Sequence, residues 1–438
     1  MANAPPRPLL LDDLPVDDDL SLWPGLREMA TQVAQMMPHL PLTSPILVSG
    51  DWGSGKTTLL RAVQRRLATQ DPPVPSVWFD AWRYEGAGPL LPALLRRLWE
   101  GAPEAVKRDE RAGTLFRKVF NLASAIALRA APAVLGIAGL GPVSEVARTL
   151  MLSPTGVKSD SEAFVDAQGL RVPADPVTEL WGSFTELVRV AWPGATPVIF
   201  VDDLDRCSPL GAVSLLDDIR MLVAGASELG CKFVVAMDRR VLANAVAAKF
   251  RDISGYDGNR YLEKVFPFVF TLPQPQGRDV GRLVTTFLAP SGPATNTDHQ
   301  DALSMVLNDP LFANPRLMKR CINRFRMVLA FEAAAGPAQP SRSGADASVA
   351  DRTLAKWIAA TERFRLLRGM LVHHGEEYWR ELEEALTRPG AQLPSVEAEE
   401  LLKDEGALPW VRREVFGGGA GRLQQLREAD NRLRRWGL

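Results

Sequence analysis

The sequence predicts an α/β fold with a parallel, doubly wound sheet, a helical insertion and a C-terminal helical lid region. Between residues 46 and 272, short apolar runs alternate with helical segments, which is typical of strand–helix–strand units. This alternation stalls from about residue 103 to residue 175, where the pattern indicates an insertion. Beyond Gly277 the pattern is helical to the end of the sequence.

The expected elements follow a Pro-rich, acidic arm at the N-terminus. The first helix covers Leu22–Met37. Short apolar runs bounded by turn residues indicate buried strands. These runs lie at 46–48, 76–82, 198–201, 233–236 and 265–272. The helices between them are expected at about 56–69, 90–99, 177–190, 215–222 and 240–248.

Four parts are expected along the chain. An N-terminal arm and helix cover 1–40, a core covers 41–275, a helical lid region covers 276–390 and a helical tail covers 391–438. The tail has apolar residues at spacings of three and four, which predicts an amphipathic helix. These residues are Leu423, Leu426, Ala429, Leu433 and Trp436. Docking on its own domain is expected, and the groove of a partner is the alternative.

Composition excludes several classes of protein. The chain has 51 Lys and Arg against 52 Asp and Glu, so a net charge of −1 argues against a globally basic nucleic-acid binder. Three scattered cysteines and four histidines give neither a disulfide framework nor a zinc spacing. The first twenty residues carry acids where a signal peptide needs an apolar core behind basic residues. We therefore expect a cytoplasmic protein.

The stretch 119–143, inside the insertion, is apolar enough to need separate treatment. A membrane-spanning helix needs about 20 mostly apolar residues. Arg129 in the middle of this stretch would cost about 2.5–3.5 kcal/mol on insertion, and Pro132 and Gly136 weaken a continuous helix. We expect a soluble helical element that is buried on the domain or on a partner. A membrane-associated hairpin is the alternative.

A glycine-rich loop follows the first apolar run and fits the pattern G-x-x-x-x-G-K-[ST]. The expected nucleotide-binding residues are Gly50, Asp51, Trp52, Gly53, Ser54, Gly55, Lys56, Thr57 and Thr58. Such a loop wraps phosphates with its backbone N–H groups, and the following helix adds its positive end. We expect Lys56 to reach the β and γ phosphates of ATP and Thr57 to hold Mg²⁺. Trp52 either covers the nucleotide or packs, and the alternative for the whole loop is a turn without nucleotide.

A second motif combines an apolar strand with two acids. The run 198–201 ends in Asp202 and Asp203, which is the form of a Walker B element. Asp202 is expected to bind Mg²⁺ from a strand that adjoins the strand of the glycine-rich loop. Asp203 is expected to polarise the attacking water. The alternative is a strand end with solvated acids.

Six blocks together carry a resemblance to a known family. They are GDWGSGKTT at 50–58, FDAWRYE at 79–85, VIFVDDLDRCSP at 198–209, FVVAMDRR at 233–240, YLEKVFPFVFTLP at 261–273 and NPRLMKRCIN at 314–323. In this order, over about residues 44–330, they resemble the KAP family of P-loop NTPases. The resemblance implies an ATPase of the additional-strand type that uses ATP and Mg²⁺.

The same resemblance implies a conformational switch or regulatory subunit with protein partners. A homo-oligomer is an alternative form of such an assembly. Many prokaryotic members resemble components of systems for conflict with phages or mobile elements, so anti-phage defence is an expected setting. Members typically carry membrane-spanning helices between the two Walker motifs, where this chain is only marginally hydrophobic. The alternative is a membrane-associated or non-hydrolysing nucleotide-binding scaffold.

Three arginines are candidates for contact with the γ phosphate. The block that begins at Asn314 resembles a sensor element, in which Arg316 is the first choice and Arg320 the second. A solvated basic helix face is the alternative for both. Arg206 either contacts the nucleotide of a neighbouring subunit or forms an ion pair within its own loop. Asp238 is either a sensor or the cap of the next helix.

Overall fold

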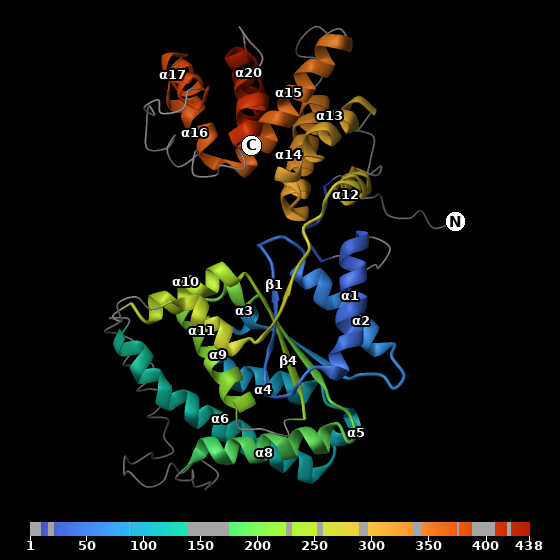
Figure 1. Cartoon of the computed structure of the whole chain (residues 1–438), viewed down its shortest axis with the longest axis vertical. Coiled ribbons are helices and arrows are strands. Elements are labelled where there is room, and N and C mark those ends of the chain that lie inside the picture. Colours follow the sequence, from blue (N-terminus) through green and yellow to red (C-terminus); the bar gives the residue numbers. More distant parts are fainter. Residues whose placement is uncertain are drawn as a thin grey trace. The chain divides into compact units, whose positions relative to one another are not determined.

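The computed structural model describes residues 10–15, 22–86, 88–137, 175–224, 230–251, 257–288, 297–335, 344–374, 376–387, 408–417 and 422–438. It consists of two compact units (Figure 1). Arg27–Leu272 forms the sheet unit, and Met1–Leu26 together with Pro273–Leu438 forms the helical unit. The sheet unit contains the glycine-rich loop and the strand that ends in Asp202.

The sheet unit is built on five parallel strands, as the alternating pattern predicts. They are β1 (Ile46–Ser49), β2 (Ser76–Asp80), β3 (Val198–Asp202), β4 (Lys232–Met237) and β5 (Phe268–Thr271). Their order across the sheet is β2-β3-β4-β1-β5. All five run in the same direction, so their carboxyl ends meet at one edge, where ligands bind in open α/β sheets.

Three expectations about the strands are wrong. The last strand begins at Phe268 rather than at residue 265, because a helix continues to Val265. β4 lies between β1 and β3, so the strand that carries Asp202 does not adjoin the strand of the glycine-rich loop. The second strand ends at Asp80 rather than at Trp82, because the Asp80 carboxylate accepts a hydrogen bond from the Arg83 backbone N–H and begins a new helix.

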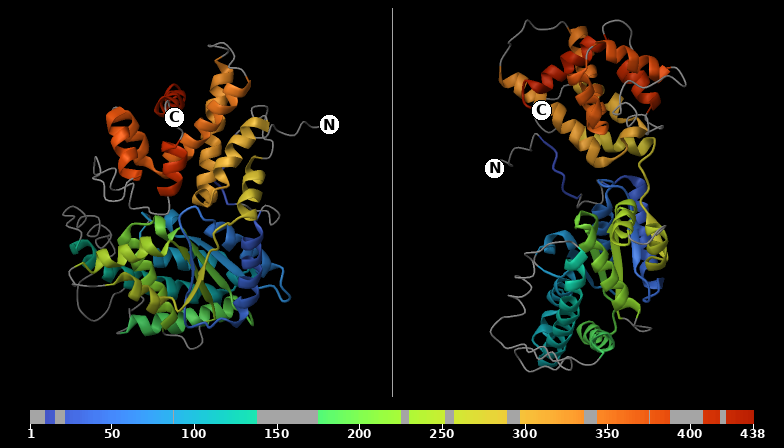
Figure 2. Two further views of the ribbon diagram at one scale, coloured as in Figure 1. Left: turned by 45° about the horizontal axis from the view of Figure 1, so that its top comes forward. Right: turned by 90° about the vertical axis from the view of Figure 1, so that its left-hand side faces the viewer.

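Helices cover both faces of the sheet (Figure 2). α1 and α2 lie on one side, and the side that bears Leu47, Phe79 and Val201 packs against a continuous apolar core supplied by the remaining helices. The helices of the unit are α1 (Pro24–Met36), α2 (Lys56–Ala68), α3 (Ala81–Tyr84), α4 (Leu90–Glu100), α5 (Glu104–Lys107), α6 (Glu110–Ile137), α8 (Pro176–Ala191), α9 (Pro209–Ala224), α10 (Arg239–Lys249) and α11 (Gly258–Val265). The sheet and its covering helices confirm the predicted doubly wound α/β fold.

The described part of the insertion is helical and is buried on its own unit. Val119, Leu122 and Ala123 on α6 belong to the same apolar core as α4 and α8. Residues 138–174 lie outside the described residues, and they include the end of the stretch 119–143, residues 138–143. Among the helices that the structure describes, none is both long and apolar enough to span a membrane.

The helical unit contains the predicted C-terminal helices. They are α12 (Arg278–Leu288), α13 (Thr297–Leu307), α14 (Pro315–Ala334), α15 (Gly344–Arg363), α16 (Arg365–His373), α17 (Glu376–Thr387), α19 (Leu408–Trp410) and α20 (Arg422–Arg434). α20 packs against α15 and buries Leu426, Ala429 and Leu433. The amphipathic tail therefore docks on its own unit.

Candidate functional site

The glycine-rich loop connects β1 to α2 at the carboxyl edge of the sheet. Gly53 and Gly55 have φ values of 83° and 103°, in the left-handed region that only glycine adopts without strain. A Cβ on Gly50 would lie 2.7 Å from Ser54 Oγ. The loop therefore needs its glycines, and its N–H groups lead directly into the N-terminus of α2 at Lys56.

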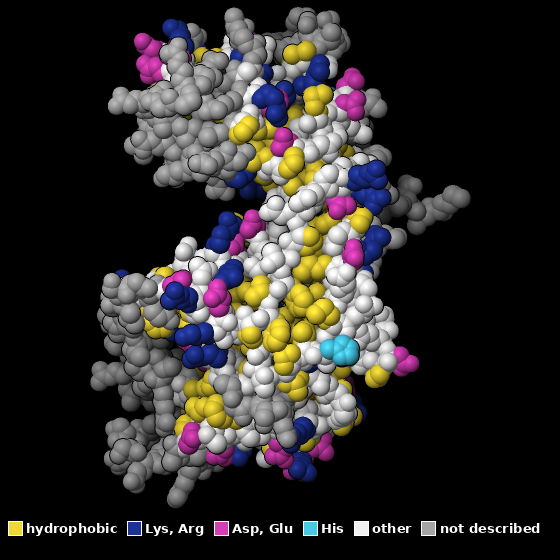
Figure 3. All heavy atoms as spheres, viewed as in Figure 1, with side chains coloured by type: hydrophobic (Ala, Val, Ile, Leu, Met, Phe, Trp, Pro, Cys, Tyr) yellow, Lys and Arg dark blue, Asp and Glu magenta, His cyan; other side chains and the backbone are white. Residues whose placement is uncertain are grey.

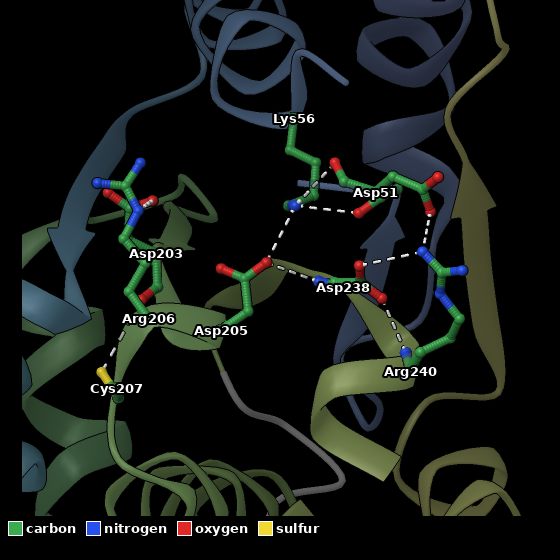
Figure 4. A network of polar contacts seen from close by, with 9 residues as sticks. Asp51, Lys56, Asp203, Asp205, Arg206, Cys207, Asp238 and Arg240 are labelled. Atoms are coloured by element: carbon green, nitrogen blue, oxygen red, sulfur yellow. Dashed lines mark hydrogen bonds and ion pairs between the residues drawn. The ribbon is translucent and has the colours of Figure 1, made fainter. Parts of the chain in front are cut away.

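Lys56 is buried at the centre of the site (Figure 4). Its Nζ lies 3.0 Å from the Gly50 carbonyl oxygen and 3.4 Å from that of Asp51. It also lies 3.0 Å from Asp205 Oδ2, and these two side chains are only 8% and 6% exposed. An ammonium has three N–H donors, so these three acceptors complete its hydrogen bonding.

Asp202, the last residue of β3, is a buried carboxylate that the protein does not fully satisfy. The Thr57 hydroxyl donates a hydrogen bond to it. Its Oδ1 has no hydrogen-bond partner among the described residues. Burial, followed by the neighbouring charge of Asp203, raises the pKa of Asp202 to about 6, against the lowering effect of Thr57. The site thus keeps a carboxylate oxygen available beside a hydroxyl.

That pair of oxygen ligands fits Mg²⁺. Hard cations such as Mg²⁺ prefer oxygen ligands, and Mg²⁺ is usually held by one or two protein groups together with water and phosphate oxygens. Within the described residues, no group of three or more His, Cys, Asp or Glu side chains is arranged to hold a metal ion.

Asp203 is held in a strained backbone conformation. Its φ of 57° makes it the one non-glycine residue with positive φ in the described parts of the chain, and such strain is concentrated at functional sites. Its Oδ1 lies 2.9 Å from Arg206 Nε, which is the ion pair within the loop that the sequence offered as one alternative. Burial raises the pKa of Asp203, the Arg206 charge opposes this, and Asp80 and Asp205 add to the rise.

A second set of contacts links Lys56 to β4 and α10. Asp205 Oδ2 accepts a hydrogen bond from the Asp238 backbone N–H at 2.9 Å. Asp238 accepts one from the Arg240 N–H, so it is the cap of α10. Arg240 Nη2 lies 2.8 Å from Asp51 Oδ1, so an ion pair connects α10 to the glycine-rich loop. Sequence reasoning placed Asp205 in a family block but did not foresee its contact with Lys56.

Two tryptophans near the motifs differ from ordinary core residues. Trp52, in the loop, is 65% exposed, so it does not pack into the core of its unit. Trp82 is 53% exposed, so it too lies outside the core. The Arg206 guanidinium lies 5.4 Å from the centre of the Trp82 ring, within the range of a cation–π contact.

The predicted sensor arginines belong to the helical unit. Asn314 caps α14 by accepting hydrogen bonds from the Arg316 and Leu317 N–H groups. Arg316 Nε lies 2.8 Å from Asp13 Oδ2, and Arg320 forms an ion pair with Glu362. The glycine-rich loop belongs to the sheet unit. A role for Arg316 or Arg320 at the γ phosphate therefore stays a prediction.

The described surface is mixed in charge. On the face drawn in Figure 3, basic and acidic side chains are interspersed, as expected from a net charge of −1.

Comparisons with known proteins agree with this geometry. Residues 27–331 match the model of the KAP family P-loop domain. The match covers more than half of the chain and includes the loop, the strand that ends in Asp202 and most of α14. The chain therefore belongs to the KAP family of P-loop NTPases.

Individual relatives are distant. The "Phage T7 exclusion protein" of Escherichia coli (strain K12) is 25% identical over 284 residues, which are 58% of this chain and 34% of that protein. The match thus spans about a third of that relative's length. A Walker-type ATPase of Pyrococcus abyssi has 11% identity and a TM-score of 0.38, covering 96% of this chain and 93% of that one. Drosophila ORC bound to DNA has 12% identity and a TM-score of 0.28, covering 92% and 85%.

Proposed function

We propose that this chain binds Mg-ATP at residues 50–58 and hydrolyses it, and that it acts as a conformational switch or regulatory subunit. The observation that carries the proposal is the convergence of Lys56, Thr57 and Asp202, which leaves one buried carboxylate oxygen without a protein partner. Buried polar groups are rarely left unsatisfied, and a ligand that completes the site is a sufficient reason.

The chain's own residues divide the work. The N–H groups of the loop and the N-terminus of α2 attract the phosphates, and Lys56 supplies a full positive charge. Thr57 and Asp202 offer oxygen ligands to Mg²⁺, which when bound neutralises negative charge on the phosphates. Asp203, whose pKa burial raises, accepts the proton of the attacking water.

A second candidate is a nucleotide-binding scaffold that does not hydrolyse. The ion pair between Asp203 and Arg206 favours it, because an arginine at 2.9 Å occupies the carboxylate that would act as the base. In this candidate, nucleotide binding alone sets the state of the protein. Hydrolysis requires Arg206 to leave or to reorient.

One experiment separates these candidates and also tests nucleotide binding. Purified wild-type chain and Lys56→Ala are titrated calorimetrically with Mg-ATP and assayed for steady-state phosphate release. We expect the wild type to bind and to release phosphate, and Lys56→Ala to lose about 100-fold or more in affinity, because it removes a buried charge–charge contact. Binding without release identifies the scaffold. Unchanged affinity in Lys56→Ala refutes the site itself.

The biological setting is a separate proposal. The family and the phage exclusion protein among the relatives support a cytoplasmic role in defence against phages, with protein partners or further copies of the chain as effectors. Plaque counts on cells that express the wild type or Lys56→Ala test it. Protection by the wild type alone is expected, and equal plaque counts contradict the proposal.

A further inference from the structure

We propose that Asp205 is a built-in competitor for the phosphates of the nucleotide: it occupies Lys56 in the empty site and is displaced when phosphate binds. The inference rests on the proposed function, because it concerns the same P-loop. It goes beyond that function by assigning a role to the third acid of the Walker B block, which neither holds Mg²⁺ nor activates water there.

The hydrogen bonds of Lys56 show which contact a phosphate replaces. Two of its three acceptors, the carbonyl oxygens of Gly50 and Asp51, belong to the loop itself. The third is Asp205 Oδ2 at 3.0 Å, the one full negative charge among the three. A phosphate oxygen that contacts Lys56 takes the place of one of these acceptors, and Asp205 is the acceptor that is a separate side chain rather than the backbone of the loop.

The environment makes this competition strong. The Lys56 and Asp205 side chains are 8% and 6% exposed, so solvent ions screen their attraction weakly. Asp202 and Asp203 already place two carboxylates in the same segment. Phosphates add negative charge to this group, and repulsion by the bound phosphates drives Asp205 away from Lys56.

Displacement of Asp205 affects a connected series of contacts within the sheet unit. The same Oδ2 accepts the Asp238 N–H at 2.9 Å, and Asp238 in turn caps α10 and contacts Arg240. Arg240 pairs with Asp51 at 2.8 Å. A movement of Asp205 therefore changes the hydrogen bonding between the end of β4 and the start of α10. In this way the position of α10 depends on whether the P-loop is occupied.

The opposite role for Asp205 is to hold Lys56 in position for the phosphates. The two roles predict opposite signs. A competitor weakens nucleotide binding, so its removal tightens binding. A positioning residue strengthens binding, so its removal weakens it. General damage to the site also weakens binding, so only the competitor predicts a gain in affinity.

The test uses Asp205→Asn in the full chain. Asparagine is nearly isosteric and removes the charge, and its carbonyl oxygen still accepts the Asp238 N–H. The matched control is Glu186→Gln on α8, which removes one negative charge from an exposed ion pair with Arg111. Dissociation constants for ADP and for tripolyphosphate are measured by calorimetry, together with melting temperatures. We expect Asp205→Asn to bind both ligands about 10-fold more tightly, within the range of coupling between close charges, and Glu186→Gln to match the wild type.

A second measurement keeps the inference testable if Asp205→Asn does not fold. Hydrogen exchange of the Asp238 amide is followed in the wild type with and without ADP, and faster exchange with ADP is expected because Asp205 is displaced. Unchanged exchange, or equal or weaker binding by a folded Asp205→Asn, overturns the inference. If the wild type binds neither ADP nor tripolyphosphate, the proposed function fails, and the inference fails with it.

Discussion

Asp202 in the sheet unit and Asp430 in the helical unit are both buried carboxylates, with 3% and 2% of their surfaces exposed. Asp430 accepts hydrogen bonds from Trp357 Nε1 at 3.2 Å, Arg368 Nε at 3.0 Å and Arg434 Nε at 2.6 Å. Asp202 accepts hydrogen bonds from the Thr57 hydroxyl and the Asp203 backbone N–H, and its Oδ1 has no partner within the described residues.

The difference separates a structural carboxylate from one that is kept for a ligand. A buried charge is destabilising unless other groups compensate it. Two arginines and an indole compensate Asp430, which thereby connects α15, α16 and α20. The negative charge of Asp202 is only partly compensated by its neighbours. Its raised pKa of about 6 reflects the free-energy cost of this buried charge. Asp202 lies at the carboxyl edge of the sheet, where a bound cation and phosphates would reduce the free-energy cost of its buried charge.

The largest expected effect concerns Asp203, the neighbour of the uncompensated acid. Asp203→Asn should bind ATP as the wild type does but release phosphate about 10²–10⁴-fold more slowly, the usual effect of removing a positioned general base. Steady-state phosphate release at saturating Mg-ATP measures it. A rate equal to that of the wild type would assign water activation to another residue.

The next effect tests whether Asp430 stabilises the fold and Asp202 does not. Asp430→Ala should lower the free energy of unfolding by about 1–3 kcal/mol, because the buried Trp357 Nε1 and the partly exposed Arg368 and Arg434 lose their acceptor. Asp202→Asn should be at least as stable as the wild type without nucleotide. Urea unfolding compares the two variants. Equal losses in both would remove the distinction between the two carboxylates.

A smaller effect follows from the pKa of Asp202. Only the ionised carboxylate binds Mg²⁺, so protons compete with the metal. With a pKa of about 6, the contribution of Asp202 to Mg-dependent affinity should fall about 10-fold from pH 7 to pH 5. Because this pKa is raised, the stability linked to Asp202 is greatest at low pH and is lost as the pH rises through about 6.

Titrations of wild type and Asp202→Asn at both pH values measure this effect. Protonation of the nucleotide affects both proteins equally. The difference in affinity between the two proteins therefore depends on Asp202 alone. A constant difference from pH 7 to pH 5 would contradict a titrating Asp202.

The smallest expected effect tests the proposed lid region, 276–390. If Arg316 contacts the γ phosphate, Arg316→Ala should bind ADP normally and a slowly hydrolysed ATP analogue about 5–10-fold more weakly, since one ion pair that water partly screens contributes about 1 kcal/mol. Arg320→Ala is the matched variant for the second choice. Equal losses for both nucleotides would make Arg316 a structural cation that pairs with Asp13.

Local signals made much of the fold and part of the site predictable. The glycine pattern located the loop before α2, and the helical pattern beyond Gly277 anticipated the helices of the helical unit. Contacts between distant segments were not predictable, because strand order is set by packing across the whole sheet. The place of β4 between β1 and β3 is one example, and the contact between Lys56 and Asp205 is another. The left-handed backbone of Asp203 has no signal in the sequence either, since aspartate adopts both conformations.

The most direct test of the account is the effect of Mg²⁺ on ADP affinity in the wild type and in Asp202→Asn. Both proteins are titrated calorimetrically with ADP at pH 7.5, with magnesium and with a chelator. If the free oxygen of Asp202 is kept for the metal, Mg²⁺ should tighten binding to the wild type by about 10-fold or more and leave Asp202→Asn nearly unchanged. An equal gain from Mg²⁺ in both proteins would contradict the account.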